Sequence, residues 1–236
     1  MLIVLLTQLL FACSTMQSSS ENTEDKVGDL PSKKVDSQEP INEESELPTS
    51  NPYQVQQLAQ QELIPQATKA EFDKAVSFIE AKQYQQANDI LDKIIKTQPH
   101  LSGTYVNKAM IAKELGELVK AQQLLAKAIS VNKLNLYAHH LRGQIYRLQG
   151  NFTLAEQSYL AALSIWPNYR EAQLSLAILL ELYRGRLVEA HQYYQRYLAL
   201  NTKDKEVKQW LAGLEIKMKR AGVNIPEPLL SRSYND

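Results

Sequence analysis

The stretch LYAHHLRGQIYRLQGNFTLAEQSYLAALSIWPNY, residues 136–169, decides the fold of this chain because its pattern recurs on both sides of it. The stretch has small residues at Gly143 and Ala155 and a large side chain at Tyr159. Residues of the same kind recur at intervals of 34 or 35. The three sets are Ala75, Ala109, Gly143 and Ala177; Ala87, Ala121, Ala155 and Ala190; and Leu91, Leu125, Tyr159 and Tyr194. Three sets in phase indicate a structural repeat.

The residues between these sets predict a pair of helices in each repeat. Small residues let the two helices cross closely, and the large residues fill the space beside them. Pro99 and Pro167 end the second helix of their repeats, because proline cannot continue a helix. A tight turn joins the two helices, and glycine suits it in three of four repeats. The turns are expected at Gln83-Tyr84, Leu115-Gly116, Gln149-Gly150 and Arg184-Gly185.

In its period and in several residues, this pattern resembles the tetratricopeptide repeat (TPR). The residues that carry the resemblance in the quoted stretch are Gly143, Tyr146, Ala155, Tyr159, Ala162 and Pro167. The resemblance implies an all-α superhelical solenoid of helix-turn-helix repeats. On this phase the repeats are 68–101, 102–135, 136–169 and 170–203. We place the extra residue of the fourth repeat in its turn, residues 182–187.

The segments that flank the repeats have different characters. A solenoid needs its last apolar face covered, and residues 204–222 predict a capping helix. Its apolar residues follow helical spacing at Val207, Trp210, Leu211, Leu214 and Met218. Residues 223–236, with two prolines, predict an extended tail, and residues 53–67 a lead-in helix. Residues 13–52 predict a disordered acidic tether, because the stretch 14–50 has nine acidic and three basic residues and no aromatic one.

The first twelve residues are apolar except for Thr7 and Gln8. As a helix they would rise about 18 Å, which is too short for the roughly 30 Å core of a bilayer. The length suits the apolar region of a secretory signal, residues 1–12, and the small Ala12 suits a processing site. Cys13, the single cysteine of the chain, follows directly.

Leu10-Phe11-Ala12-Cys13 resembles a bacterial lipobox. The resemblance implies that Cys13 receives a covalent lipid and becomes the first residue of a mature lipoprotein. Two or more acyl chains hold a protein stably on a membrane. Ser14, in place of an aspartate, resembles the signal for delivery to the outer membrane, where the protein would face the periplasm. The alternative is a cysteine buried beside an apolar N-terminal helix.

Composition and motifs argue against several classes of protein. The 26 basic and 26 acidic residues balance, and no cluster of Lys and Arg indicates nucleic-acid binding. The sequence has no phosphate loop, nucleophile elbow or dinucleotide turn. His139 and His140 point about 100° apart on a helix, so they cannot chelate one ion together. We therefore expect no enzyme activity, no catalytic residues, no metal site, no small-molecule substrate and no cofactor other than the lipid on Cys13.

The resemblance places the functional surface on the concave face, which first helices of successive repeats line. This groove would be apolar at one end, basic and aromatic in the middle, and acidic and apolar at the other end. Carrying over the groove positions of the family gives Phe72, Val76, Ile79, Val106, Met110, Lys113, Tyr137, His140, Gln144, Arg147, Glu171, Leu174, Ile178 and Glu181.

Such a groove suits a peptide or helix of a protein partner, with Arg147 and Lys113 selecting acidic groups. Residues 53–64 or the tail could instead cover Phe72, Val76 and Ile79. Family members that grip a C-terminal carboxylate use two asparagines and three basic residues, of which only Asn107 is present, so that mode is rejected. The lipobox with repeats resembles the pilotin-type lipoproteins that assemble pili or secretion machines. The resulting hypothesis is a membrane-anchored scaffold, and the alternative is a periplasmic adaptor or chaperone for a peptidoglycan or envelope enzyme.

Overall fold

The computed structural model describes residues 50–226 of the 236-residue chain. The expected signal peptide, Cys13 and most of the expected tether lie outside this range, as do residues 227–236 of the expected tail. Within residues 50–226 the structure is all-helical, with no β-strand. None of these helices is both long and apolar enough to cross a bilayer.

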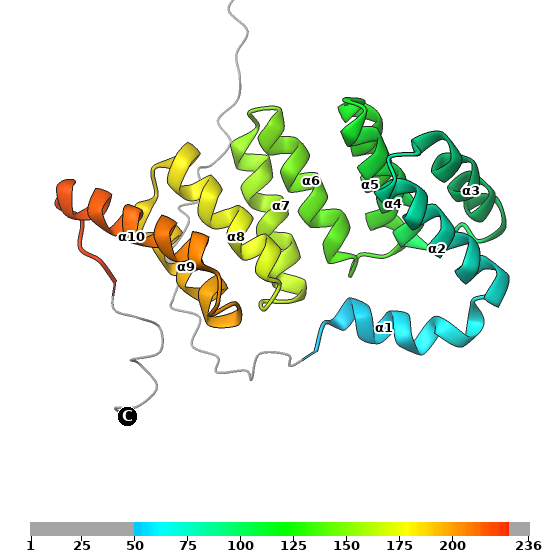
Figure 1. Cartoon of the computed structure of the whole chain (residues 1–236), viewed down its shortest axis with the longest axis horizontal. Helices are drawn as coiled ribbons and strands as arrows, with labels where there is room; N and C mark the ends of the chain where they lie inside the picture. The colour runs from blue at the N-terminus through cyan, green and yellow to red at the C-terminus, as the bar shows by residue number, and fades with distance from the viewer. Residues whose placement is uncertain (1–49, 227–236) are drawn as a thin grey trace, which may run out of the picture. The chain divides into compact units, whose positions relative to one another are not determined.

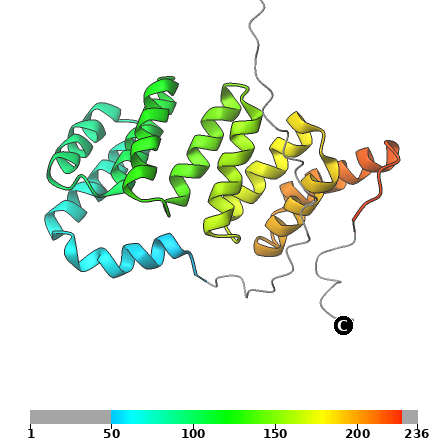
Figure 2. The same cartoon turned by 180° about the vertical axis from the view of Figure 1, so that it is seen from behind.

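The helices of residues 66–200 form four successive antiparallel pairs, and each pair packs against the next. Figure 1 and Figure 2 show the pairs side by side in chain order. The first two pairs are α2 (Gln66–Glu80) with α3 (Tyr84–Thr97) and α4 (Ser102–Glu114) with α5 (Leu118–Val131). The last two are α6 (Leu136–Leu148) with α7 (Phe152–Ile165) and α8 (Arg170–Leu179) with α9 (Leu187–Leu200). The fold is the TPR array that the sequence predicts.

Helix α1 (Pro52–Gln60) precedes the array and is shorter than the lead-in helix expected over residues 53–67. A short 3-10 turn, η1 (Gln61–Leu63), follows it, and α2 begins at Gln66 because Pro65 starts a new helix. Asn51 lies inside the range assigned to the tether, yet it is 3% exposed and caps α1 through the amides of Tyr53 and Gln54. Folded structure therefore begins before the expected boundary.

Close packing within each pair follows the small and large residues of the repeat. All eight small residues of the first two sets are buried. Tyr159 is fully buried and lies against Gly143, where an added Cβ would stand 2.5 Å from the Tyr159 ring. Real Cβ atoms do not approach that closely, so glycine is required at this crossing. The pairing of Gly143 with Tyr159 sets how closely α6 and α7 approach.

In every repeat, the turn between paired helices needs one residue with a left-handed backbone conformation, in which φ is positive. Gly116, Gly150 and Gly185 take this conformation in repeats two to four. In the first repeat Lys82 takes it, with φ of 57°, so the turn lies at Ala81-Lys82, two residues before the expected Gln83-Tyr84. A side chain is strained in this conformation, which makes the first turn the least favourable of the four.

The extra residue of the fourth repeat lies in a helix and not in the turn. Residues Leu180–Arg184, η2, form a π-helical end to α8, and Gly185 follows with φ of 66°. A π-helical turn accommodates one inserted residue by widening the helix. The predicted range 182–187 overlaps this π-helical segment at residues 182–184, but its assignment to the turn is wrong, because the turn keeps the form it has in the other repeats.

Helix α10 (Lys205–Arg220) covers the end of the array and packs against α9. Asp204 caps it through the amides of Glu206 and Val207. Val207, Leu214 and Met218 are buried, but Trp210 is 39% exposed. Trp210 therefore does not belong to the apolar stripe that the sequence predicts, since Val207, Leu214 and Met218 occupy the packed face. Beyond the helix, Val223 and Ile225 pack against the same core.

Candidate functional site

The fourteen predicted groove residues lie on the first helices of the pairs, with Glu181 in the π-helical end of α8. None is fully buried: Tyr137 and Glu171 are exposed, and the other twelve are half-buried. Several have a second role in the core. Ile79, Met110, Leu174 and Ile178 pack against buried clusters of their own repeats. These four apolar residues therefore stabilise the array and are also partly exposed at its surface.

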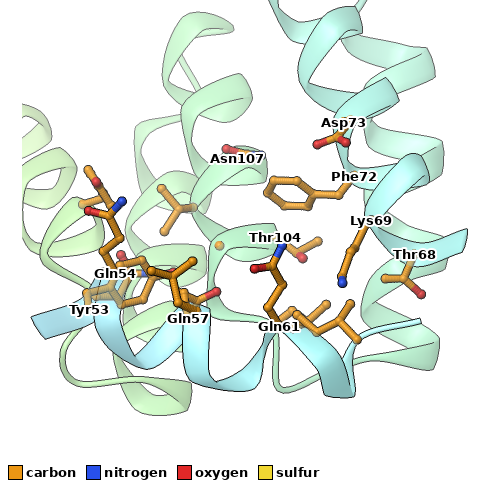
Figure 3. Close-up of a pocket in the computed structure, with 17 residues that line it drawn as sticks. Tyr53, Gln54, Gln57, Gln61, Thr68, Lys69, Phe72, Asp73, Thr104 and Asn107 are labelled. Atoms are coloured by element: carbon orange, nitrogen blue, oxygen red, sulfur yellow. The ribbon is translucent and has the colours of Figure 1, made fainter. Parts of the chain in front are cut away.

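The structure brings three of the predicted residues, Phe72, Val106 and Tyr137, into one pocket of about 540 Å³. This α1 pocket lies where α1 and η1 cross the first turns of α2 and α4, and Figure 3 shows Phe72 reaching from α2 toward Asn107 on α4. Val76 and Ile79 do not line the pocket. The lead-in segment and Phe72 therefore line the same pocket, and the covering of this end of the groove by residues 53–64 stays a prediction.

Tyr53 anchors α1 to the array. Its side chain is 7% exposed, and its hydroxyl lies 3.3 Å from both Ser102 Oγ and Asn135 Nδ2. Asn135 Nδ2 also donates to Ser102 Oγ at 3.0 Å, and Asn135 Oδ1 accepts from the Ala138 amide and so caps α6. The Tyr53 ring packs edge-on against Tyr137. One buried tyrosine thus ties α1 to the first turns of α4 and α6.

A second polar link ties the same helix to the end of the second repeat. Asn132 Nδ2 donates to Gln56 Oε1 at 2.8 Å. Asn132 Oδ1 accepts from the Leu134 amide, which bends the chain where the second repeat lacks a proline. Helix α1 is therefore fixed near Tyr53 and Gln56, at the end opposite to η1.

His140 is held in place by its neighbours on both ring nitrogens. Nδ1 lies 3.1 Å from the Tyr169 hydroxyl, and Nε2 lies 2.9 Å from Ser175 Oγ. Burial lowers the pKa of His140 to about 4, and nearby Lys113 also lowers it while Glu171 raises it. His140 is therefore neutral at pH 7. The middle of the groove takes its positive charge from Lys113 and Arg147 and not from this histidine.

The acidic residues predicted at the far end of the groove already have partners. Glu181 accepts a hydrogen bond from the Tyr194 hydroxyl at 3.0 Å and lies 3.7 Å from Lys217 Nζ. Arg170 Nε donates to Glu171 at 3.0 Å on an exposed surface. Glu181 therefore joins α8 to α9 and α10, and its role is structural. Glu171 is the more accessible of the two.

Sequence reasoning predicted Phe72, Val106 and Tyr137 of the α1 pocket but missed the residues that anchor α1 beside it. Tyr53, Ser102 and Asn135 come from three separate elements and share no repeat position. The one available signal was an aromatic residue in an otherwise glutamine-rich segment, residues 53–61. In residues 50–226 no group of three or more His, Cys, Asp or Glu side chains is placed to hold a metal ion.

The fold is that of a TPR array, a class of structure built from successive pairs of antiparallel helices. A family model of the tetratricopeptide repeat matches residues 102–133 and 136–169, which are the second and third repeats on the phase derived above. No curated protein sequence matches the chain.

Several solved structures are similar to this chain. The Pseudomonas aeruginosa pilF protein matches with a TM-score of 0.60 at 20% identity, over 65% of this chain and 70% of that one. A thermophilic TPR protein of Thermus thermophilus matches with a TM-score of 0.55 at 25% identity, over 68% and 87%. A MamA protein matches with a TM-score of 0.55 at 15% identity, over 66% and 83%. At these identities the likeness is one of fold.

Proposed function

We propose that this protein is a membrane-anchored scaffold that binds a segment of a partner protein along the first helices of its repeats. The observation that carries the proposal is the partly exposed surface of the predicted groove residues on α2, α4, α6 and α8, of which Phe72, Val106 and Tyr137 line the α1 pocket. TPR arrays are interaction modules, and a groove lined by apolar and polar side chains suits an extended or helical peptide.

The charge of the surface favours a partner with apolar and acidic residues. Lys113 and Arg147 are half-buried and lie one repeat apart on α4 and α6. Lys113 pairs with the neighbouring Glu114 at 3.0 Å, so the arginine is the stronger candidate for a paired contact with a carboxylate. The partner segment would cross both residues and reach the apolar positions on α8.

We propose that the partner belongs to an envelope machine such as a pilus or a secretion system. The fold of the pilF protein of Pseudomonas aeruginosa supports this choice, together with the lipobox-like sequence at Cys13. A photo-crosslinking residue at Arg147, in cells that carry the full chain, tests it. The same residue at Lys127, which is exposed on α5, is the matched control.

We expect the crosslinker at position 147 to capture a pilus or secretion subunit that is absent from the control at position 127. Capture of peptidoglycan enzymes alone would favour an adaptor of the periplasm and would overturn the envelope-machine assignment. Equal capture at both positions would contradict binding through the first helices.

The membrane anchor is proposed to be a lipid on Cys13, with the protein at the outer membrane and facing the periplasm. Cys13→Ser removes the sulfur that would carry the lipid, and it lies far in sequence from the repeats. We expect the variant to leave the membrane fraction while its helical circular dichroism and melting temperature stay unchanged. Continued sedimentation with membranes would show that Cys13 is not the anchor.

A further inference from the structure

The last helix, α10, has an outer surface rich in positive charge. It lies at the end of the array and packs against α9 (Figures 1 and 2). Residues 203–220 have one exposed carboxylate, Glu206, because Asp204 caps the helix and Glu215 lies 3.0 Å from His191 Nε2. The same residues have six exposed cations, Lys203, Lys205, Lys208, Lys217, Lys219 and Arg220. The surface of α10 is therefore strongly positive, although the whole chain is neutral.

Helix stability explains the cations at one end of α10 but not those at the other end. The last turn of a helix favours positive charge because the backbone dipole is negative there, and this turn holds Lys217, Lys219 and Arg220. Lys205 begins the helix, where positive charge is unfavourable, and Lys208 lies three residues further. Within the described residues, Lys217 is the only cation of α10 near a carboxylate, with Glu181 at 3.7 Å. Lys205 and Lys208 therefore serve no ion pair or helix-dipole contact within the array.

Apolar side chains lie among these cations on the side of α10 that faces away from the array. The packed side holds Val207, Leu214 and Met218. At 100° per residue, the opposite side holds Lys205, Gln209, Gly213, Ile216 and Arg220. Ile216 is 52% exposed near the centre of this side, and Trp210 is 39% exposed at its border. An added Cβ at Gly213 would meet nothing within 4 Å, so this side is open.

We propose that α10 docks on the surface of an anionic lipid bilayer. Its lysines and arginine would lie beside the phosphates, with Ile216 and Trp210 in the interface between headgroups and acyl chains. Charge alone would attract an acidic polypeptide as well. The open side is the convex half of a single helix with an apolar residue between cations, which fits a flat surface that is negative outside and apolar beneath.

This contact is separate from the lipid proposed at Cys13 and from the first-helix surface. A few lysines and one or two apolar side chains give weak, reversible binding to a membrane. Washing of a membrane fraction would release such a contact, so the Cys13→Ser variant is still expected to leave that fraction. The contact would hold the end of the array against a bilayer to which another group anchors the chain.

Vesicle sedimentation tests the proposal with residues 14–236, which contain every described residue. Residues 1–13 are left out because an apolar segment or a lipid would bind vesicles by itself. Phosphatidylglycerol vesicles are the anionic probe, and phosphatidylcholine vesicles are the neutral one. At about 0.1 M salt we expect sedimentation with the anionic vesicles only, and release at about 1 M salt. Binding should also shift the fluorescence of Trp210 to shorter wavelength, and Trp210→Phe should lose this shift.

Two pairs of substitutions separate the charge of α10 from the charge of the whole chain. Each lysine near an anionic surface strengthens binding about fivefold, so Lys205→Gln with Lys208→Gln should weaken it at least about tenfold. Lys96→Gln with Lys127→Gln removes the same charge from exposed positions on α3 and α5 and is the matched control. The control should change binding by less than about twofold. Melting temperatures show that the variants remain folded.

Ile216→Gln separates a bilayer from an acidic polypeptide, because it changes no charge. It should weaken binding to phosphatidylglycerol vesicles by about threefold or more and leave binding to the probe poly-L-glutamate unchanged. Equal sedimentation with both kinds of vesicle would overturn the proposal, as would equal losses in the two lysine pairs. Tight binding of poly-L-glutamate, with vesicle binding insensitive to Ile216→Gln, would assign α10 to an acidic protein segment instead. None of these results bears on crosslinking at Arg147.

Discussion

Gly143 carries the tightest contact in the repeat that decides the fold. Its missing Cβ makes room for the fully buried ring of Tyr159. We predict that Gly143→Ala lowers the free energy of unfolding by about 1–3 kcal/mol, because overpacking outweighs the gain in helix propensity. Chemical denaturation of the full chain measures the loss.

The reason for this loss can be tested with a second substitution. Repeats one and two pair alanine in the first set with leucine in the third, at Ala75 with Leu91 and at Ala109 with Leu125. Gly143→Ala combined with Tyr159→Leu should therefore be more stable than the sum of the two single changes predicts. Additive losses would show that Gly143 is required for another reason.

His140 makes the stability of the middle of the array depend on pH. Burial lowers its pKa to about 4 from the ordinary 6.5, so the folded state binds this proton less tightly than the unfolded state. The contribution of neutral His140 to the free energy of unfolding is complete above pH 6.5 and is lost as the pH falls toward 4. Two charged groups act on it, Glu171 from α8 and Lys113 from α4, while Tyr169, Tyr159 and Ser175 pack against its ring or bind it.

We predict that the free energy of unfolding falls by up to about 3 kcal/mol between pH 6.5 and 4 because of His140. Urea denaturation across this range, in the wild type and in His140→Gln, isolates the effect, since glutamine does not titrate. Partial burial also lowers the pKa of His139, so His139→Gln serves as the comparison. An equal pH slope in the wild type and in His140→Gln would contradict this origin.

Among the elements, α1 holds its place on the array mainly through Tyr53, with a second link from Gln56 to Asn132. Tyr53 is the one buried residue of α1, and its hydroxyl meets Ser102 and Asn135. We predict that Tyr53→Ala releases α1, so that amide hydrogens of residues 52–60 exchange at the rate of unfolded chain. The loss of stability cannot exceed the free energy of docking α1, because the repeats remain packed without it.

The control for this prediction is Tyr53→Phe, which keeps the ring against Tyr137 and removes only the hydroxyl. It should cost about 1 kcal/mol in α1 docking and leave slow exchange in residues 52–60. Asn135 keeps its bond to Ser102 at 3.0 Å in that variant. Fast exchange in Tyr53→Phe, or fast exchange in α6 and α7 of Tyr53→Ala, would contradict the proposed anchor.

The repeat period predicted the helix pairs well because small and large residues pack the two helices together in the same way in each repeat. Gly143 and the alanines of its set mark the crossings, and the second helices of repeats two to four begin at Leu118, Phe152 and Leu187, two residues after the glycines of the predicted turns. Prediction was weaker where a repeat departs from its neighbours. The π-helical end of α8 and the left-handed Lys82 depend on how local backbone strain is accommodated, and the spacing of side chains does not show this.

Across the whole molecule, the sequence predicts that the first helices line a groove, which stays a prediction, but it does not predict the α1 pocket. The α1 pocket arises where a segment before the array crosses two repeats, and Tyr53 finds Ser102 and Asn135 at distances of 49 and 82 residues along the chain. The repeat pattern of the sequence does not predict a contact between residues so far apart in the chain. The role of Glu181 was likewise hidden, because Lys217 comes from the capping helix.

If the first helices of the repeats form the binding surface, a bound partner segment will protect their backbone amides from exchange. Hydrogen–deuterium exchange of the full chain, with and without the partner segment that crosslinking at Arg147 recovers, tests it most directly. We predict slower exchange in α2, α4, α6 and α8 on binding and unchanged exchange in α5, α7 and α9. Slower exchange confined to the second helices or to the turns between helices would contradict the account.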